Sequence, residues 1–559
     1  MAGFVKTGLR SDFYYKEGYM RTCVSPEGSF VYGIHAPAFS VKNFRPKDRR
    51  MQLGVLADNG PLANEANFPE QDVDVPAADK VFEVPNAFAF RGVTYINTRW
   101  ADENAKDPVS LIRLPESEPV SFGSVLSAWQ PDSRVSDRQR AQMLGALPGP
   151  LKLALAETGT DPEDLMALAG MACDFVFDPQ TGCPDGLVYR QGTDGRIRAS
   201  VHDNTLFETL ANNPCLPEIY RQVMVLRPGV QGANEIVGEY GGANAQTHVY
   251  EYLRSNSYIA WGHYAANMAE DAVRYSAAGL SLADMRGMRH LYYQRTYARL
   301  AQDLGISVNI SRRGIEEHGL EDLRLRIFEL LKDEQKRRNL RFNRTLWGWN
   351  YGFDYAPSGY RLHASHQQIH QQYAMIPKTV AAAPGTDPQM AAYAIGDQVE
   401  TFVSQYFAQT GVCFFDAYIS AIENNQRMDG AENRAQSLIV DRDENAMVFV
   451  PKAQTSQWEL QVMAAKPAGH IAEADTEMRR SLDAAILKAA KALCRMGAKM
   501  ITFYEVSRRM DMGDNGQRLF YVILPRLPES PGAFSESQLR WINGHYPEDF
   551  AAACRAALK

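Results

Sequence analysis

The chain has no apolar run that approaches the roughly 20 residues that a helix needs to span a bilayer. Its first ten residues contain too short an apolar run for a secretory signal peptide. We therefore expect a protein of the cytoplasm that does not bind membranes.

Paired cysteines are also absent. The seven cysteines are scattered, and no two have Cys-x-x-Cys spacing. This argues against a disulfide framework and against a structural zinc site built from paired thiolates. The net charge of -7 gives no general reason to expect nucleic acid as a partner, and the basic run 47–50 is more simply a solvated surface.

The length and composition are those of a globular protein with more than one core. The chain has 559 residues, of which 45% are hydrophobic and 22% charged. Alternating apolar residues predict strands over 80–84 and 93–97, and helical periodicity predicts helices over 138–147, 150–157 and 162–172, the last capped by Asp161. We interpret residues 1–230 as a β-rich and then helical region of unknown role.

One order of elements occurs twice in the rest of the chain. The first copy has an apolar strand near 257, a helix that begins at Ser281 with Asp284 in a capping box, an aromatic strand over 345–352 and a strand that ends at Pro377. The second copy has strands over 437–441, 446–451 and 458–465, a helix from Thr476, and strands over 501–506 and 518–525.

A highly charged helix predicted over 311–341, with a solvated face, accounts for most of the difference in length between the copies. Strands grouped around one helix per copy favour antiparallel α+β sheets over a doubly wound parallel sheet. We interpret 231–395 and 396–535 as the halves of a duplicated α+β core, and 536–559 as a C-terminal helical tail.

The densest chemical signal is the stretch Leu362-His-Ala-Ser-His-Gln-Gln-Ile-His-Gln-Gln-Tyr-Ala-Met-Ile-Pro377. On an extended chain, Gln368, His370 and Gln372 point to one face. An imidazole between two amides suits a phosphate, because the ring nitrogen attacks phosphorus while the amides steady the charged oxygens.

Two other interpretations of this stretch stay open. The histidines could be surface or structural groups on a polar strand. They could also bind a metal, since His366 and His370 are four residues apart, as on the metal-binding face of a helix. However, no His-Glu-x-x-His pattern is present, and 369–377 is typical of a strand.

The stretch resembles the active-site strand of the nucleotide-transferring branch of the histidine-triad (HIT) superfamily. This branch includes galactose-1-phosphate uridylyltransferases and diadenosine tetraphosphate phosphorylases. Its approximate pattern is Ala-Ser-x-x-His-x-His-x-Gln, and this chain has Ala364-Ser365-His366-Gln367-Gln368-Ile369-His370-Gln371-Gln372. The resemblance implies that His370 is the nucleophile that forms a covalent nucleotidyl-histidine, and that Gln372 binds the phosphate.

The resemblance implies further substrate contacts. Ser365 would hold another phosphate oxygen, Asn350 and Gly352 would approach the phosphates, and His263 would line the nucleotide pocket unless it only caps a strand end. The chain departs from the family at Gln368, where the family has its first histidine, so Gln368 would support the nucleophile differently.

A second register of the motif is possible. Sliding the motif by two residues would place Gln372 at the nucleophile position and leave the protein inactive by this mechanism. Ser365 and Gln372 both favour the first register.

The second half resembles the partner domain of the same duplicated fold. Its histidine positions hold Leu519, Tyr521 and Ile523, so the resemblance implies one active and one degenerate half.

Other polar and aromatic residues have two interpretations each. Arg508, Arg509 and Arg526 could hold a polyphosphate or sugar phosphate, or could be scattered surface arginines. Trp347 and Trp349 could stack a base, or could belong to the core, as alternating aromatic residues on a strand more often do.

By this resemblance the protein is a nucleotidyltransferase or phosphorylase. Its partners would be a nucleoside polyphosphate or nucleotide-sugar donor and other phosphate-bearing small molecules. No cofactor is required, although Mg²⁺ could accompany a polyphosphate. The alternatives are a nucleotide hydrolase of the same superfamily and a non-catalytic nucleotide-binding protein on a decayed scaffold.

Overall fold

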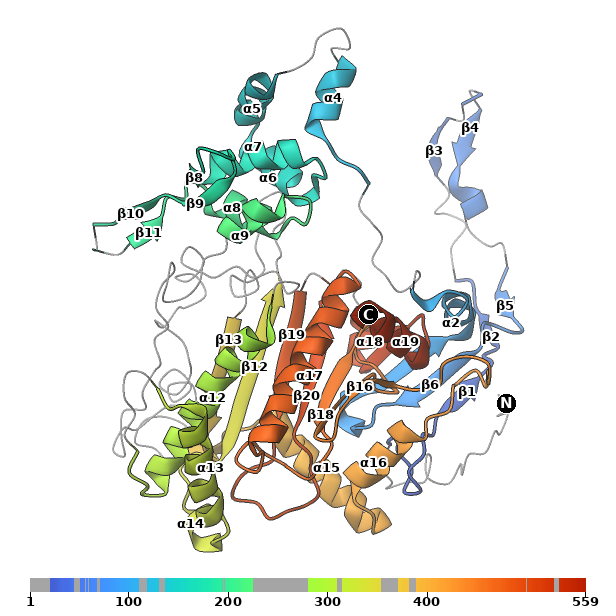
Figure 1. The fold of residues 1–559 in the computed structure, drawn as a ribbon. Helices are drawn as coiled ribbons and strands as arrows, with labels where there is room; N and C mark the ends of the chain where they lie inside the picture. Colours follow the sequence, from blue (N-terminus) through green and yellow to red (C-terminus); the bar gives the residue numbers. More distant parts are fainter. Residues whose placement is uncertain are drawn as a thin grey trace.

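A computed structural model describes residues 21–44, 51–55, 57–58, 60–67, 71–109, 118–129, 136–193, 195, 197–224, 280–308, 314–352, 370–381, 389–498, 500–526 and 532–559. Helices and strands are mixed along the chain, so the α+β class is confirmed (Figure 1). None of the helices in these ranges is long and apolar enough to cross a membrane.

A seven-stranded sheet in the order β13-β12-β19-β20-β18-β17-β16 occupies the centre of the molecule, and every neighbouring pair in it is antiparallel. Its strands are β12 (Arg344–Gly352), β13 (His370–Ile376), β16 (Ile439–Arg442), β17 (Ala446–Phe449), β18 (Leu460–Ala464), β19 (Met500–Val506) and β20 (Phe520–Pro525). The strands predicted over 345–352 and between 437 and 525 are confirmed. The extended conformation predicted for the histidine-rich stretch is confirmed over 370–376, whereas 362–369 and the strand near 257 lie outside the described residues.

Helices α12 (Leu282–Asp303), α13 (Glu317–Leu331) and α17 (Thr476–Arg495) cover one face of this sheet (Figure 1). The predicted capping box of α12 is present, because Ser281 Oγ accepts from the Asp284 N–H at 3.1 Å and the Asp284 carboxylate accepts from the Ser281 N–H at 2.9 Å. The buried face of α12 packs with α17 into the largest hydrophobic core.

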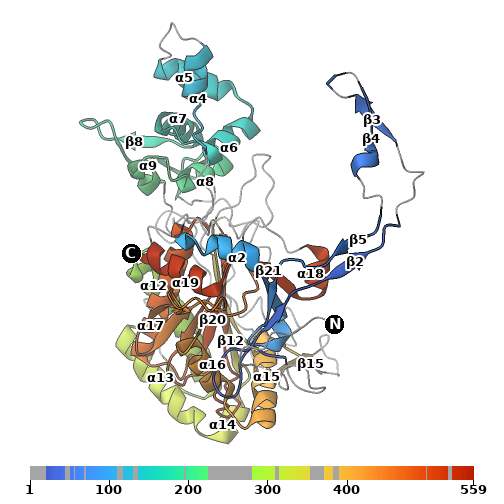
Figure 2. The same ribbon diagram turned by 90° about the vertical axis from the view of Figure 1, so that its right-hand side faces the viewer.

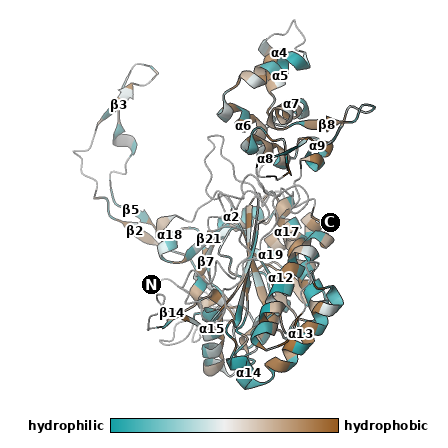
Figure 3. Ribbon diagram, turned by 90° about the vertical axis from the view of Figure 1, so that its left-hand side faces the viewer, coloured by the Kyte–Doolittle hydropathy of each residue, from teal (hydrophilic) through white to brown (hydrophobic). Residues whose placement is uncertain are grey.

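The charged segment forms two helices, so the single helix predicted over 311–341 is wrong. Helix α13 ends at Leu331, and α14 (Glu334–Arg338), which is hydrophilic along its length in Figure 3, begins after Asp333. The Asp333 carboxylate accepts from the backbone N–H groups of the next helix, which favours a cap over a continuous helix. The prediction that the charges of this segment form a solvated face is also only partly right, because Arg324 of α13 is buried and donates a hydrogen bond to Glu321.

Helices α15 (Ile395–Thr410) and α16 (Phe414–Glu423) cover the other face, together with a segment from the N-terminal region. That segment contains β6 (Val81–Pro85), η3 (Ala89–Arg91), β7 (Val93–Asn97) and α2 (Thr98–Asn104). Phe88 stacks on Phe520 of β20, with ring centroids 5.2 Å apart and planes inclined by 7°. This second core therefore joins the N-terminal segment to the central sheet.

A smaller sheet brings the two ends of the chain together. Strands β1 (Gly33–His35), β6, β7 and β21 (Arg540–Asn543) lie in that order, and β21 runs parallel to β7. The segment predicted to be a helical tail therefore contributes a strand as well as α19 (Pro547–Leu558), preceded by α18 (Ala533–Ser537). Parallel addition to a distant strand has no local sequence signal, which is why the tail was predicted as helix alone.

Residues 118–224 surround a third hydrophobic core. The elements are α4 (Phe122–Trp129), α5 (Asp137–Ala146), α6 (Gly149–Thr158), α7 (Pro162–Ala172), β8 (Phe175–Phe177), β9 (Pro184–Leu187), β10 (Tyr189–Gln191), β11 (Ile197–Ala199), α8 (Asn204–Asn212) and α9 (Glu218–Val223). The three helices predicted here are confirmed to within one residue at each end, and Asp161 caps α7 by accepting from the Glu163 N–H.

Three further pairs of short strands complete the described elements. Strands β2 (Phe39–Val41) and β5 (Val73–Val75), then β3 (Gln52–Val55) and β4 (Pro61–Ala63), extend the β1–β6 hairpin into a ribbon that projects from the body (Figure 2). A one-turn helix, η2 (Asn64–Asn67), follows β4, and β14 (Thr379–Ala381) pairs with β15 (Gln389–Ala391).

Candidate active site

The strand register places His370 in a row of residues that cross the central sheet. His370 is the first residue of β13 and is directly opposite Asn350 of β12. Asn350 is opposite Thr502 of β19, and Thr502 is opposite Leu524 of β20. Because directly paired residues project to the same side of a sheet, these four positions share one face. That face is the one on which α15 and α16 pack.

The adjacent row on this face contains Gln372. It is opposite Gly348, which is opposite Tyr504, which is opposite Val522. Gly348 has no side chain, so nothing from β12 stands between Gln372 and Tyr504, and an added Cβ would lie 3.4 Å from the Phe503 carbonyl oxygen. Among the residues that the structure describes, the two rows therefore leave space over β12 at Gly348, next to the backbone of His370.

Solvent reaches this face at one corner of the sheet. Gln372, Thr502, Tyr504 and Leu524 are partly exposed, and Arg526 is exposed, whereas the other positions of β20 on this face are buried. The Gln372 side chain forms no hydrogen bond with another described residue. An amide that is open to solvent can donate to an incoming anionic oxygen.

Arg526 lies at the same corner. Its backbone N–H donates to the Met500 carbonyl oxygen at 2.7 Å, and its Nε donates to Thr502 Oγ1 at 3.3 Å. The side chain therefore stands over β19, two strand spacings, or about 10 Å, from β13. Burial raises the pKa of Tyr504 nearby, so its hydroxyl stays protonated and can donate a hydrogen bond.

The opposite face of β13 belongs to the core. Gln371 accepts from Trp347 Nε1 at 2.8 Å, and the rings of Tyr373 and Tyr292 have centroids 5.7 Å apart. Only 3% of Trp347 and 2% of Trp349 is exposed, so the interpretation that these rings stack a base is wrong. A cavity between α12 and β13 on this face has a volume of about 20 Å³, which is too small for a nucleotide.

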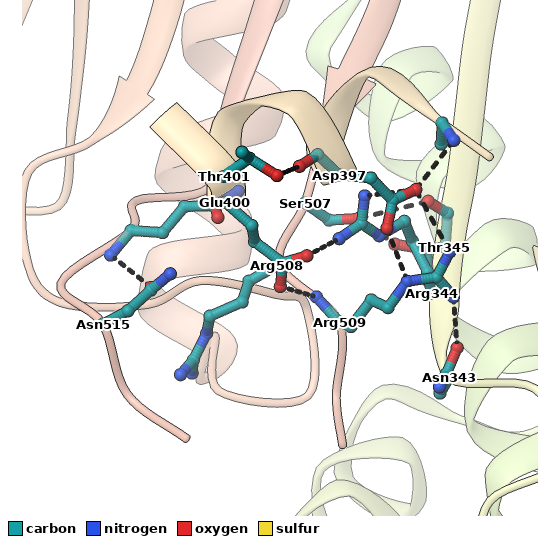
Figure 4. Close-up of polar contacts among 12 residues, drawn as sticks. Asn343, Arg344, Thr345, Asp397, Glu400, Thr401, Ser507, Arg508, Arg509 and Asn515 are labelled. Carbon is teal, nitrogen blue, oxygen red and sulfur yellow. Dashed lines mark hydrogen bonds and ion pairs between the residues drawn. The ribbon is translucent and has the colours of Figure 1, made fainter. Parts of the chain in front are cut away.

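A buried ion network fixes the far ends of β12 and β13 (Figure 4). Arg344 of β12 pairs with Asp397 at 3.2 Å and with Glu400 at 2.6 Å, both from α15. Arg509, which follows β19, pairs with the same Asp397 at 2.7 Å and donates to the Pro377 carbonyl oxygen at 3.1 Å. Burial raises the pKa of Glu400 and lowers that of Arg344. The network ties α15 to both strands that hold the candidate site.

Two of the three predicted phosphate-binding arginines are therefore excluded. Arg508 and Arg509 are 2% and 4% exposed, and their guanidinium groups pair with Glu473 and Asp397, respectively. They are neither surface residues nor open to a ligand. Arg526 is the one of the three that solvent reaches.

The register also corrects the positions assigned to the degenerate half. Leu519, Tyr521 and Ile523 project to the face covered by α12 and α17, where Tyr521 donates to Glu505 at 2.9 Å. The β20 residues on the face of His370 are 520, 522 and 524. Because side chains alternate along a strand, a shift of one residue moves the whole set to the other face. These positions hold Phe, Val and Leu, so this strand offers no histidine on that face either.

The other predicted site residues are placed only in part. The backbones of Asn350, Gly352 and His370 are described, whereas Ser365, Gln368 and His263 lie outside the described residues. The sequence analysis did not identify Gly348, Thr502 or Tyr504. The alternation of 501–506 puts Thr502 and Tyr504 on one face, but only the strand register shows which face that is.

In the ranges that the structure covers, no three His, Cys, Asp or Glu side chains are grouped as metal ligands.

Comparisons with known proteins give fold-level likeness alone. No family model and no curated protein matches the chain. Among solved structures, a galT-like protein from Arabidopsis thaliana is 16% identical over 43% of this chain and 69% of its own, with a TM-score of 0.28. An ADP-glucose phosphorylase from Arabidopsis thaliana with bound ADP-glucose is 16% identical over 43% and 66%, with a TM-score of 0.28. A uridylyltransferase is 14% identical over 42% and 68%, with a TM-score of 0.30.

Less than half of this chain is similar to these three solved structures. A HIT-like protein from Bartonella henselae matches a shorter part, with 21% identity over 22% of this chain and 85% of its own and a TM-score of 0.16. The chain spans about two thirds of the length of the larger solved structures. At these TM-scores the likeness assigns neither a substrate nor a residue role.

Proposed function

We propose that the protein transfers nucleotidyl groups through a covalent adduct on His370. One observation carries the proposal: His370 and Gln372 lie on the same side of β13, at the corner where solvent reaches the sheet, with Asn350 opposite and the Gly348 gap beside them. A histidine position next to two amide-bearing positions on one face of a sheet suits attack on a phosphate and binding of its oxygens.

The reaction has two displacement steps. In the first, a ring nitrogen of neutral His370 attacks the α-phosphorus of a nucleoside polyphosphate or nucleotide sugar, and the leaving phosphate oxygen takes the electrons of the broken P–O bond. In the second, a phosphate oxygen of the acceptor attacks the same phosphorus, the P–N bond breaks and His370 is regenerated. The amides of Gln372 and Asn350 donate to the non-bridging oxygens. The residues require no metal, and Mg²⁺ would enter with a polyphosphate substrate.

The second half of the core serves as a wall of the same site in this proposal. The order helix, strand, strand occurs as α12-β12-β13 and as α17-β19-β20, and β12 pairs with β19 so that the two units share one sheet. This supports a duplicated core with halves at 231–395 and 396–535. The second half supplies Thr502, Tyr504 and Arg526 in place of a second nucleophile, and Arg526 binds the phosphate of the leaving group and acceptor.

Mass spectrometry of the intact protein tests the proposal. The protein is incubated with nucleoside di- and triphosphates, nucleotide sugars and adenylyl sulfate, and peptides are searched for an added nucleoside monophosphate. We expect an acid-labile adduct on His370 that His370→Asn abolishes, while His363→Asn and His366→Asn, in the same stretch, retain it. The absence of an adduct with every donor would overturn the proposal. Release of nucleoside monophosphate without an acceptor would identify water as the acceptor, and ligand-induced stabilisation without turnover would indicate a binding protein.

A further inference from the structure

Arg91, in the one-turn helix η3 of the N-terminal segment, contacts the central sheet on the face of His370. Its guanidinium donates to Glu459 Oε1 at 2.7 Å, and it also forms a side-chain hydrogen bond with Tyr504. Gln461 of β18 lies in the row of Tyr504, and Glu459 is two residues before Gln461, so all three project to one face. A residue of the N-terminal segment therefore reaches a residue of the candidate site.

The side chains around Arg91 hold it in one position. Glu459 Oε1 also accepts from Gln461 Nε2 at 2.9 Å, and Glu459 Oε2 accepts from the backbone N–H and the hydroxyl of Thr455 at 2.7 and 2.8 Å. Thr455 Oγ1 in turn accepts from Arg91 at 2.8 Å. The Arg91 side chain is 8% exposed, and that of Glu459 is fully buried. A buried ion pair with these additional hydrogen bonds has little freedom to rotate.

The C-terminal segment fixes the backbone of Arg91 as well. Trp541 Nε1 of β21 donates to the Arg91 carbonyl oxygen at 2.9 Å. The next residue, Gly92, has a φ of 89°, and an added Cβ there would lie 2.0 Å from the Leu539 carbonyl oxygen. The close approach requires glycine, so η3 is held against the C-terminal segment at this point.

The order of the strands places Arg91 and Gly348 on opposite sides of Tyr504. Strand β19 carries Tyr504 and lies between β12, which carries Gly348, and β20, and β18 lies beyond β20. Arg91 is bound to Glu459 and Thr455, which precede β18, so its guanidinium reaches Tyr504 from the β18 side. A tyrosine hydroxyl has one proton to donate in addition to the lone pair that Arg91 occupies. That proton is donated to no other described residue.

We infer that Arg91 is a positioning residue of the candidate site. By binding the Tyr504 hydroxyl from the β18 side, it orients the hydroxyl proton towards the space over Gly348, where the hydroxyl donates to a phosphate oxygen of the nucleotide. The inference rests on the proposed function, because it places the nucleotide beside His370. It also gives the N-terminal segment a role in the site, whose other described side chains come from the central sheet.

A paired substitution removes Arg91 without leaving a buried charge. Arg91→Met alone would leave the Glu459 carboxylate buried without its cation, which is strongly destabilising. The pair variant therefore carries Arg91→Met and Glu459→Gln. Gln461 can turn its Oε1, which is buried and has no partner, towards the new amide. Arg91→Lys is a second, milder variant, because it keeps a cation for Glu459 but lacks the fork of donors that also reaches Tyr504.

Nucleotide affinity of the full-length protein is the measurement. All variants carry His370→Asn, so that no adduct forms, and calorimetric titration with ADP, GDP, CDP and UDP gives each Kd. The pair variant and Arg91→Lys are each measured with and without Tyr504→Phe. The control is Lys452→Met with Glu548→Gln, which removes another fully buried ion pair, joined at 2.6 Å. Thermal midpoints confirm that each variant is folded.

We expect Tyr504→Phe to raise the Kd of the diphosphate that binds best by about 10-fold or more, through loss of a hydrogen bond to a charged group. The pair variant and Arg91→Lys should raise it by about 5-fold when Tyr504 is present and by less than about 2-fold when Tyr504→Phe is present, because Arg91 acts through that hydroxyl. The control should leave it unchanged.

Equal increases with and without Tyr504→Phe overturn the inference, because Arg91 then acts on the fold or on the ligand directly. So does an unchanged Kd in both Arg91 variants, and so does failure of all four diphosphates to bind. The proposed function is decided separately, with His370 intact. The expected coupling without any adduct would contradict the proposed function alone, whereas an adduct on His370 without the coupling would contradict the role of Arg91 alone.

Discussion

Gln371 and Gln372 are adjacent in the sequence and project to opposite faces of β13. The Gln371 side chain accepts a hydrogen bond from the buried indole of Trp347, whereas Gln372 is opposite Gly348 at the open corner of the sheet. The pair therefore offers a matched comparison in which the same substitution is made on the core side and on the proposed phosphate side of one strand.

Gln372→Glu should impair transfer far more than Gln371→Glu. A carboxylate at 372 repels the phosphate and cannot donate to its oxygens, so we expect the rate of adduct formation to fall by about 100-fold or more. Gln371→Glu keeps an acceptor for Trp347, so its rate should stay within about 3-fold of the unmodified protein's. The rates are measured by quenched-flow mass spectrometry. Equal losses in the two variants would show that residue 372 has no special contact with the phosphate.

Side chains introduced at Gly348 should reduce substrate binding before they affect folding. The Cβ of Gly348→Ala would meet the Phe503 carbonyl oxygen at 3.4 Å, an ordinary contact, so we expect the free energy of unfolding to change by no more than about 1 kcal/mol. Gly348→Leu fills the gap between Gln372 and Tyr504. Its KM for the nucleotide donor should rise at least about 10-fold, as expected when a bulky group fills a preformed site. KM and thermal midpoint are measured for both variants, and a KM unchanged in Gly348→Leu would place the donor elsewhere.

Local sequence signals were sufficient for most of the elements. The capping box at Ser281 and Asp284 predicted the start of α12, and the apolar runs 437–441 and 446–451 predicted the strands β16 and β17. These features are encoded by neighbouring residues, so they can be read without tertiary structure. The prediction for the charged segment was wrong for the opposite reason. Asp333 can be either a helical residue or a cap, and packing decides between the two.

Register and long-range pairing could not be predicted. The alternation of β20 separates its two faces, but only pairing with β19 and β12 shows that 520, 522 and 524 share the face of His370. The Gly348 gap likewise exists only because β19 lies next to β12. The addition of β21 to β7 joins residues more than 440 positions apart, and no local pattern specifies it.

Asp483 should make stability depend on pH. It is buried in α17, where Arg289 Nε donates to it at 3.0 Å, and burial raises its pKa from 3.8 to about 6, against the opposing effect of Arg289. Because the folded-state pKa lies above the unfolded value, protonation of Asp483 favours the folded state. This contribution is complete below about pH 4 and is lost as pH rises through 6. The measurement is the difference in unfolding free energy between the unmodified protein and Asp483→Asn from pH 4 to pH 7.5.

That difference should change by about 3 kcal/mol across the window, from the size of the pKa shift. The Asn variant removes the titration while preserving size and an acceptor for Arg289. A difference that is flat from pH 4 to pH 7.5 would show that Asp483 has the same pKa in the folded and unfolded states. Asp441 provides the matched control, because it forms an ion pair with Lys488 at 2.7 Å on the surface. Asp441→Asn should change the free energy of unfolding much less across the same pH range.

Arg526 should affect donors only when their leaving group carries a phosphate. Its guanidinium stands over Thr502, in the row of His370, and we propose that it binds the phosphate beyond the one that His370 attacks. Arg526→Gln removes a charge-assisted hydrogen bond, so adduct formation from a nucleoside diphosphate or nucleotide sugar should slow by about 10- to 100-fold. A nucleoside 5′-phosphorimidazolide delivers the same nucleotidyl group with imidazole as the leaving group. Its rate should stay within about 3-fold of that of the unmodified protein, because the contact does not exist with this donor.

The comparison of donors separates a phosphate contact from a general disturbance of the site. If Arg526→Gln slows both donors equally, the residue positions the strands rather than the leaving phosphate. If it slows neither, the guanidinium does not reach the substrate. Arg138→Gln, at an exposed position of α5, is the charge-matched control and should leave both rates unchanged. Because His370 forms the adduct with either donor, the phosphorimidazolide also reports on the nucleophile when Arg526 is absent, so a failure of the Arg526 assignment leaves the proposed nucleophile testable.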